Sequence, residues 1–227
     1  MVRRKRESGS VQVWNNMYRQ IPNLITLSRL VLTALFFIAI NFAGRQRDIP
    51  MCMWIALVIF LLAVASDALD GYLARSWKVE SAFGRVVDPF ADKILICGAF
   101  IFFAAPQLML PHLTITPVAQ RSDLTGVAPW MAVVLIAREF LVTGIRGLAE
   151  SQGIDFRAMW TGKVKMIVQC AAVIGVLVYL ALIYEIQNQS VLTAFRWARN
   201  IAIWATLIVT VASAWQYISK AWRIIDA

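Results

Sequence analysis

The chain has 227 residues, of which 60% are hydrophobic and 15% charged, and its mean hydropathy is +0.67. Soluble domains are nearer half apolar and a quarter charged. So few charged residues cannot cover a water-facing surface, which excludes a soluble globule, and the apolar content excludes a disordered chain. The three cysteines lie far apart in apolar segments, so no disulfide framework is expected. The net charge of +9 is interpreted as an excess of basic residues on the cytoplasmic face of a membrane protein, and no nucleic-acid partner is expected.

Six apolar segments predict six transmembrane helices. They fall at about 24–43, 51–75, 86–106, 128–149, 163–184 and 195–220. Each is close to the roughly 20 residues that a helix needs to cross a hydrocarbon core of about 30 Å. In lipid, a helix satisfies its own backbone hydrogen bonds, and the apolar runs lack the alternation of barrel strands. The predicted fold class is therefore an all-α integral membrane protein, with a single six-helix domain at 23–227.

The distribution of lysine and arginine predicts the orientation. With six spans, the N-terminus, the second and fourth loops and the C-terminus share one side, and most basic residues fall there. By the positive-inside rule both termini are cytoplasmic, in the inner (cytoplasmic) membrane of the cell. The start lacks the pattern of a cleavable signal peptide. Within the N-terminal segment 1–22, residues 11–22 mix aromatic, aliphatic and polar side chains. This mixture favours a helix in the headgroup layer, and a flexible cytoplasmic tail is the alternative.

Four aspartates occur at helical spacing where the second and third predicted helices meet. The acids and the small residues among them are Asp67, Asp70, Gly71, Ala74, Gly84, Asp88 and Asp92. Residues three or four positions apart share one face of a helix, so each helix presents two carboxylates beside small residues. A short loop makes the two helices antiparallel. We therefore expect the four carboxylates to converge near the cytoplasmic end of the membrane core.

Such a group of carboxylates calls for cations, because desolvation and mutual repulsion would otherwise raise the pKa values of the acids. The alternative is that the aspartates reach water or pair with Arg75, Arg85 and Lys93. Oxygen ligands without His or Cys favour Mg²⁺, Mn²⁺ or Ca²⁺, and two divalent ions would balance four negative charges. The small residues would leave a trough beside the ions, although close helix packing explains any single glycine equally well.

The pattern resembles the signature of the CDP-alcohol phosphotransferases, a family of six-helix membrane enzymes. Over residues 67–92 it reads Asp67-x2-Asp70-Gly71-x2-Ala74-Arg75-x8-Gly84-x3-Asp88-x3-Asp92. Such enzymes transfer a phosphatidyl or phospho-alcohol group from a CDP-linked donor to an alcohol and release CMP. The resemblance implies two divalent cations, Mg²⁺ or Mn²⁺, held by Asp67, Asp70 and Asp88, with Asp92 beside the metals as the general base. It also implies a CDP site lined by Gly71, Ala74, Arg75 and Gly84.

Basic residues in the fourth and fifth predicted helices indicate the kind of acceptor. Arg138, Arg146 and Lys163 fall on the cytoplasmic side of the predicted topology. Ionisable residues inside spans usually face a site or a partner, and guanidinium groups match phosphate oxygens. A phosphorylated acceptor is therefore expected, and cationic acceptors such as choline are disfavoured. Two alternatives stay open: Arg138 pairs with Glu139 or a carbonyl, and Lys165 contacts lipid headgroups.

Three further segments are similar to bacterial phosphatidylglycerophosphate synthases: Ile21–Arg29, Ala137–Arg146 and Trp160–Lys165. With the signature, the resemblance covers most of residues 20–185. It implies transfer of the phosphatidyl group of CDP-diacylglycerol to the 1-hydroxyl of sn-glycerol 3-phosphate by a homodimer embedded in membrane lipids, with the active site facing the cytoplasm. Asn23, Thr26 and Arg29 would then contact the donor or help to shape its site.

Other acceptors and one other class of protein remain as alternatives. Relatives that use phosphatidylglycerol, inositol phosphate or serine would keep the same metal site. A divalent-cation transporter is disfavoured, because the acids cluster at one edge of the predicted membrane region and the halves show no repeat. The single histidine, His112, falls in the long loop between Pro106 and Pro129, and it is expected to be a surface residue instead of a ligand.

Overall fold

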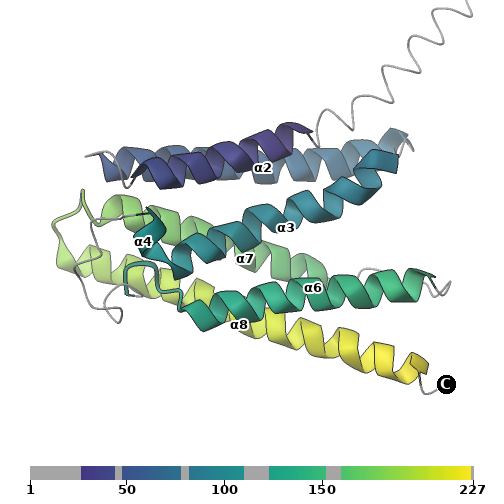
Figure 1. The fold of residues 1–227 in the computed structure, drawn as a ribbon. Coiled ribbons are helices and arrows are strands. Elements are labelled where there is room, and N and C mark those ends of the chain that lie inside the picture. Colours follow the sequence, from purple (N-terminus) through teal and green to yellow (C-terminus); the bar gives the residue numbers. More distant parts are fainter. Residues whose placement is uncertain (1–26, 44–47, 78–81, 110–122, 152–159, 226–227) are drawn as a thin grey trace, which may run out of the picture. The chain divides into compact units, whose positions relative to one another are not determined.

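The computed structural model describes residues 27–43, 48–77, 82–109, 123–151 and 160–225. Within these ranges every regular element is a helix (Figure 1). Each of the six predicted segments contains one. In chain order they are the helix Leu27–Ala43, α2 (Ile49–Trp77), α3 (Ala82–Ala104), the short α4 (Pro106–Met109), α6 (Pro129–Ser151), α7 (Trp160–Leu182) and α8 (Gln189–Ile225).

The helix boundaries differ from the predicted ones by a few residues, and two of the differences have a clear local cause. The third helix ends at Ala104, before the predicted residue 106, because Pro106 disfavours a helical conformation at the residue before it and instead begins α4. The last helix is longer at both ends than 195–220. It begins early because Asn188 caps it: the amide N–H of Ser190 donates to Asn188 Oδ1 at 3.0 Å.

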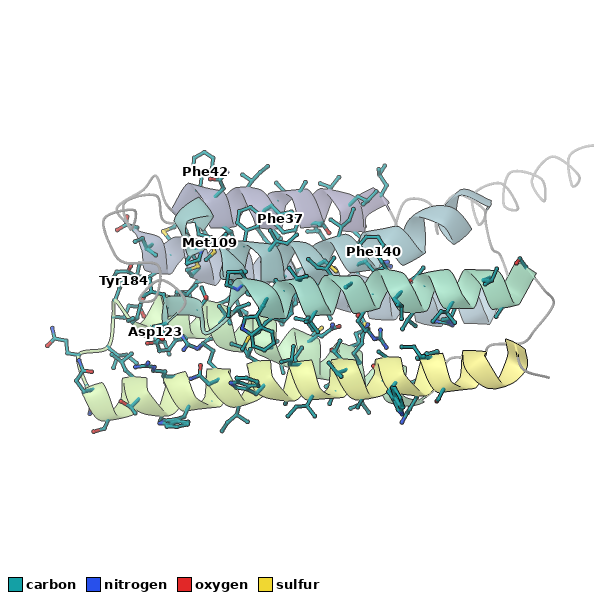
Figure 2. The ribbon with its side chains drawn as sticks, turned by 60° about the horizontal axis from the view of Figure 1, so that its bottom comes forward. Phe37, Phe42, Met109, Asp123, Phe140 and Tyr184 are labelled. Atoms are coloured by element: carbon teal, nitrogen blue, oxygen red, sulfur yellow. The ribbon has the colours of Figure 1, made fainter. Side chains whose placement is uncertain are left out.

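Three of the described helices are long and apolar enough to cross a membrane, over Ile49–Asp67, Gly162–Leu182 and Gln189–Ser219. Shorter apolar helices cover Leu27–Ala43 and Lys93–Ala104. Large apolar side chains extend outward, as Phe42 does in Figure 2, which suits a lipid environment. The prediction of a helical membrane protein is thereby supported, while six spans and cytoplasmic termini stay predictions. The predicted segment 1–22 lies outside the described residues.

The chain divides into two compact units that alternate along the sequence, so the predicted single domain at 23–227 stays a prediction. The first unit joins the residues up to Ile38 with Val58–Leu95. Inside it, the fully buried rings of Phe36 and Phe60 pack with centroids 5.6 Å apart. This contact holds the first helix against α2, on the part of α2 that leads into the acidic segment.

The second unit joins Ala39–Leu57 with Ile96–Ala227, and in it α8 packs against both α6 and α7. Thr206 on α8 donates to the carbonyl oxygen of Val168 on α7 at 3.0 Å. Trp130 on α6 stacks at a tilt on Trp204, with ring centroids 6.2 Å apart. Figure 1 shows α6 and α8 running in the same direction and α7 in the opposite one. Polar side chains from all three helices therefore meet along α8.

Candidate functional site

The acidic segment has the predicted helical backbone. α2 continues without a break through Asp67 to Trp77, and α3 begins at Ala82. The expected spacing of acids and small residues on helices is therefore present. The side chains that lie outside the description are those of Asp70, Gly71, Ala74, Arg75, Gly84, Asp88 and Asp92. Asn23, Thr26 and His112 also lie outside the described residues. Convergence of the four carboxylates stays a prediction.

Asp67 is the one acid of the signature whose side chain is described, and it forms an ion pair with Arg29. Arg29 Nη2 lies 2.8 Å from Asp67 Oδ1, and the two side chains are 3% and 27% exposed. A counter-charge offsets part of the desolvation cost of a buried guanidinium. The pair joins the helix Leu27–Ala43 to α2 inside the first unit. The carboxylate of Asp67, the first acid of the signature, stays partly exposed.

The donor set at the signature fits a hard divalent cation. Asp67 is partly open to its surroundings, and the other acids at helical spacing supply only oxygen ligands, which Mg²⁺ and Mn²⁺ prefer. Among the side chains that the structure describes there is no group of three His, Cys, Asp or Glu residues. The side chains of the other three aspartates of the signature lie outside the described residues.

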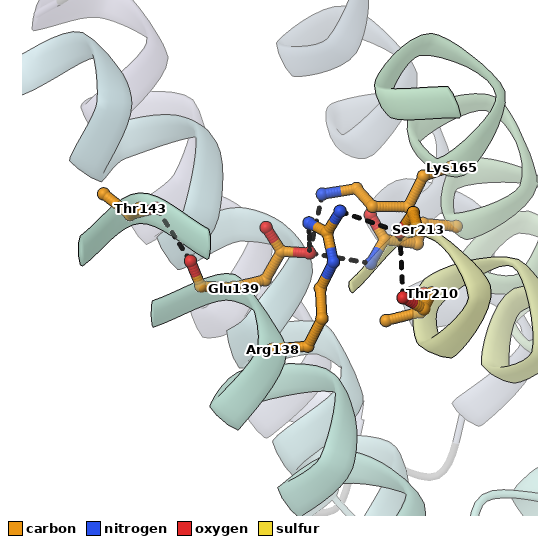
Figure 3. Close-up of polar contacts among 7 residues, drawn as sticks. Arg138, Glu139, Thr143, Lys165, Thr210 and Ser213 are labelled. Atoms are coloured by element: carbon orange, nitrogen blue, oxygen red, sulfur yellow. Dashed lines mark hydrogen bonds and ion pairs between the residues drawn. The ribbon is translucent and has the colours of Figure 1, made fainter. Parts of the chain in front are cut away.

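A second polar group is buried in the second unit, and we call it the Glu139 cluster (Figure 3). Its members are Arg138, Glu139, Lys165, Gln169 and Ser213. Glu139 Oε1 accepts from Lys165 Nζ at 2.6 Å, from Arg138 Nη1 at 3.3 Å and from Gln169 Nε2 at 3.4 Å. Two cations thus share one carboxylate, so the cluster carries net positive charge inside an apolar helix bundle. Such a charge favours an anionic ligand.

Arg138 links Glu139 on α6 to α8. Its Nη2 donates to Ser213 Oγ at 2.8 Å, and its guanidinium lies 5.9 Å from the ring centroid of Tyr217. The pairing of Arg138 with Glu139 that the sequence left open is therefore present. Its Nε is buried and has no hydrogen-bond partner within the described part of the chain. Arg138 is held firmly and retains one donor.

The other two predicted acceptor residues have different surroundings. Arg146, two turns further along α6, is partly buried, and its Nε likewise has no hydrogen-bond partner among the described residues. Lys163 is exposed, whereas Lys165, for which lipid contact was the alternative, is only 14% exposed and binds Glu139. Sequence reasoning missed Gln169. A usable signal was its spacing one turn after Lys165 in an otherwise apolar helix.

A second buried arginine, Arg199 on α8, donates to neutral acceptors among the described residues, and we call this group the Arg199 clamp. Arg199 Nη1 donates to the carbonyl oxygens of Leu124 at 2.6 Å and Asp123 at 3.2 Å. Its Nη2 donates to Asn200 Oδ1 at 2.8 Å, and the guanidinium lies 4.2 Å from the ring centroid of Tyr179. Its side chain is 1% exposed. Its contacts hold the segment before α6 against α7 and α8.

A family model and several known proteins similar to this chain point to the same family. The model of the family described as CDP-alcohol phosphatidyltransferase matches residues 19–212. A Bacillus subtilis protein named CDP-diacylglycerol–glycerol-3-phosphate 3-phosphatidyltransferase is 32% identical, covering 89% of this chain and 95% of its own. A protein of the same name from Yersinia pestis is 28% identical, covering 91% and 97%. Another, from Cereibacter sphaeroides, is 31% identical, covering 67% and 61%.

Proposed function

The chain belongs to the CDP-alcohol phosphatidyltransferase family, and from this premise we propose that it transfers the phosphatidyl group of CDP-diacylglycerol to sn-glycerol 3-phosphate. The attacking 1-hydroxyl forms a new bond to the phosphatidyl phosphorus, the bond to CMP breaks, and the products are phosphatidylglycerophosphate and CMP. Relatives of that name cover nearly the whole chain. The observation that carries the choice of acceptor is the buried Glu139 cluster, whose net positive charge suits a phosphate-bearing alcohol.

The donor half of the reaction is assigned to the acidic segment. Asp67, Asp70, Asp88 and Asp92 would hold two divalent cations, Mg²⁺ or Mn²⁺. Such ions neutralise a pyrophosphate and stabilise a departing phosphate oxygen. Asp92 would take the proton of the attacking hydroxyl as general base. Support comes from the unbroken helices α2 and α3 and from the partly exposed carboxylate of Asp67.

The cytidine nucleotide would lie beside these acids. The residues assigned to its binding are Gly71, Ala74, Arg75, Gly84, Asn23 and Thr26. Small residues on one helix face allow a flat group to approach the backbone closely. The proposal is supported by the helical spacing of the first four along α2 and α3.

The acceptor phosphate is assigned to Arg138, Arg146 and Lys163. Arg138 and Arg146 each retain a buried Nε with no hydrogen-bond partner among the described residues, and a phosphate oxygen would satisfy such a donor. Lys165 adds positive charge through its contact with Glu139. Lys163, which is exposed, would attract the acceptor at the entrance to the site.

We place the enzyme in the inner membrane with six spans, both termini and the active site facing the cytoplasm, as a homodimer. Two exposed tryptophans of α8 support a membrane-spanning position. Trp197 and Trp215 are 65% and 71% exposed, and they lie about 27 Å apart along the helix axis. Tryptophan is enriched at both membrane–water interfaces, whose separation is about 30 Å across the hydrocarbon core.

The test is CMP release by detergent-purified protein with CDP-diacylglycerol and Mg²⁺ or Mn²⁺. Glycerol 3-phosphate, phosphatidylglycerol, inositol phosphate and serine are supplied in separate reactions. We expect release only with glycerol 3-phosphate, and none after EDTA removes the metal. Release only with another alcohol would reject the acceptor assignment and keep the donor. No CMP release from folded protein with any of the four alcohols would reject the donor assignment and favour the alternative of a divalent-cation transporter.

A further inference from the structure

The ion pair between Arg29 and Asp67 restrains a proposed metal ligand from a neighbouring helix. The arginine side chain is 3% exposed, whereas the carboxylate is 27% exposed. Asp67 neutralises the buried guanidinium, and the guanidinium in turn limits rotation of the carboxylate. The nearby hydroxyls of Thr33 and Ser66 instead donate to carbonyl oxygens of their own helices, both at 2.8 Å. Arg29 therefore supplies a contact that crosses between helices at the first acid of the signature.

Pairing with arginine is compatible with metal binding by the same carboxylate. The ion pair engages Oδ1 of Asp67 at 2.8 Å, and a carboxylate offers two oxygens with about four lone-pair directions. Carboxylates that bind metals are commonly held by hydrogen bonds from surrounding groups. Loss of such a supporting group lowers metal affinity or activity by about 10- to 100-fold.

Resting on the proposed function, in which Asp67 binds metal, we infer that Arg29 is a positioning residue: it holds the Asp67 carboxylate in the orientation that binds the divalent cation. Arg29 acts through Asp67 and not on the substrates. Since its fork is rigid and planar, it fixes the direction of its partner better than a lysine ammonium can. The role differs from that expected by resemblance, in which Arg29 contacts the donor or shapes its site.

The experiment measures Mn²⁺ binding to the full-length protein in detergent without substrates, from the electron paramagnetic resonance signal of free Mn²⁺. We expect Arg29→Gln to weaken Mn²⁺ binding by about 10- to 100-fold and Arg29→Lys to weaken it less. Excess Mn²⁺ should restore turnover by the Gln variant while the KM for CDP-diacylglycerol stays unchanged. A general loss of structure would not be reversed by metal in this way.

Arg199→Gln is the matched control, because it removes another buried arginine, one that belongs to the other unit. It should lower the melting temperature and leave the Mn²⁺ affinity of the folded protein unchanged. Wild-type Mn²⁺ affinity in folded Arg29→Gln would overturn the inference. So would a raised KM for the donor that excess Mn²⁺ does not reverse. If the Gln variant does not fold, Arg29→Lys provides the same test.

Asp67→Ala separates this inference from the proposed function. If Asp67→Ala binds Mn²⁺ as tightly as the wild type, the metal role of Asp67 is wrong and the proposed donor site fails with it. If Asp67→Ala loses Mn²⁺ binding and Arg29→Gln keeps it, the metal site stands and only the positioning role of Arg29 is wrong.

Discussion

The two compact units contain buried polar groups of opposite composition. In the first unit, one buried arginine, Arg29, pairs with the first of four aspartates at helical spacing. In the second, one buried glutamate, Glu139, binds the two cations Arg138 and Lys165. In the first unit, the carboxylates are proposed to bind metal ions. In the second, the cations are proposed to bind the phosphate of the acceptor. Among the described side chains, an ion pair between residues of opposite sign therefore lies at each of the two proposed sites.

The Arg199 clamp shows what a buried cation looks like when it has a structural role. Its partners are carbonyl oxygens, an amide oxygen and an aromatic ring, all neutral and fixed by the fold. Arg138 instead keeps an Nε without a hydrogen-bond partner in the described part of the chain. Among the described contacts, Arg199 is thus fully hydrogen-bonded, whereas Arg138 keeps one buried donor for a further partner.

The largest expected effect tests the catalytic role of the first unit. Asp92→Asn should lower kcat by about 10²- to 10⁴-fold, because the amide cannot accept the proton of the attacking hydroxyl. Binding of the CDP donor should be largely retained. CMP release and donor binding to the purified variant measure the two quantities. Glu185→Gln, which changes an exposed acid outside the signature, is the control. Loss of donor binding by folded Asp92→Asn would reject the role of general base.

Removal of the negative charge of Glu139, the one acid of the Glu139 cluster, should have the next largest effect. Glu139→Gln leaves Arg138 and Lys165 buried without their carboxylate, which should cost about 3–5 kcal/mol of stability. Adding Lys165→Met to this variant removes one of the two cations and should recover part of the loss. Thermal unfolding in detergent measures both. A Glu139→Gln variant as stable as the wild type would show that the cluster does not need its carboxylate.

Arg146→Ala tests whether the basic residues of the second unit bind the acceptor and not the donor. Loss of a charged hydrogen-bond donor corresponds to about 1.5–3 kcal/mol, so the KM for glycerol 3-phosphate should rise by about 10- to 100-fold. The KM for CDP-diacylglycerol should change little. Lys163→Ala, at an exposed position, should have a smaller effect. Steady-state kinetics with each substrate varied in turn provide the measurement, and an unchanged acceptor KM would remove Arg146 from the phosphate site.

The smallest expected effect concerns the Arg199 clamp. Gly126 has φ +75°, and a Cβ there would lie 2.8 Å from Asn200 Oδ1. Gly126→Ala should therefore lower stability by about 1–2 kcal/mol through backbone strain, with added crowding, and leave both KM values unchanged. Gly144→Ala is the matched control, because nothing lies within 4 Å of its Cβ position. A Gly126 variant as stable as this control would show that the clamp tolerates movement.

The sequence predicts the features that depend on local periodicity and on spacing. Apolar segments of membrane length became helices, and the acids of the signature lie on the expected ones. The early start of α8 was also readable, since Asn188 is a favoured N-cap residue. The choice between Lys163 and Lys165 was not, because it depends on how α7 is rotated against Glu139 of α6.

Burial of Arg199 could not be predicted for a similar reason. Its partners Leu124 and Tyr179 are distant in sequence, and only tertiary packing brings their carbonyl and ring to the guanidinium. The family resemblance, which rests on spacing within short segments, is confirmed by the match over residues 19–212. The roles of the individual site residues stay predictions.

The length of α8 links this enzyme to the thickness of its membrane. Its 37 residues extend over about 56 Å, almost twice the hydrocarbon core. If Trp197 and Trp215 lie near the two interfaces, as proposed above, a thicker or thinner bilayer would be met by a change of tilt, because sliding would move a tryptophan out of its preferred layer. Tilting α8 would shift Ser213 relative to Arg138, which it contacts. Acceptor affinity is then expected to vary with lipid chain length in reconstituted vesicles.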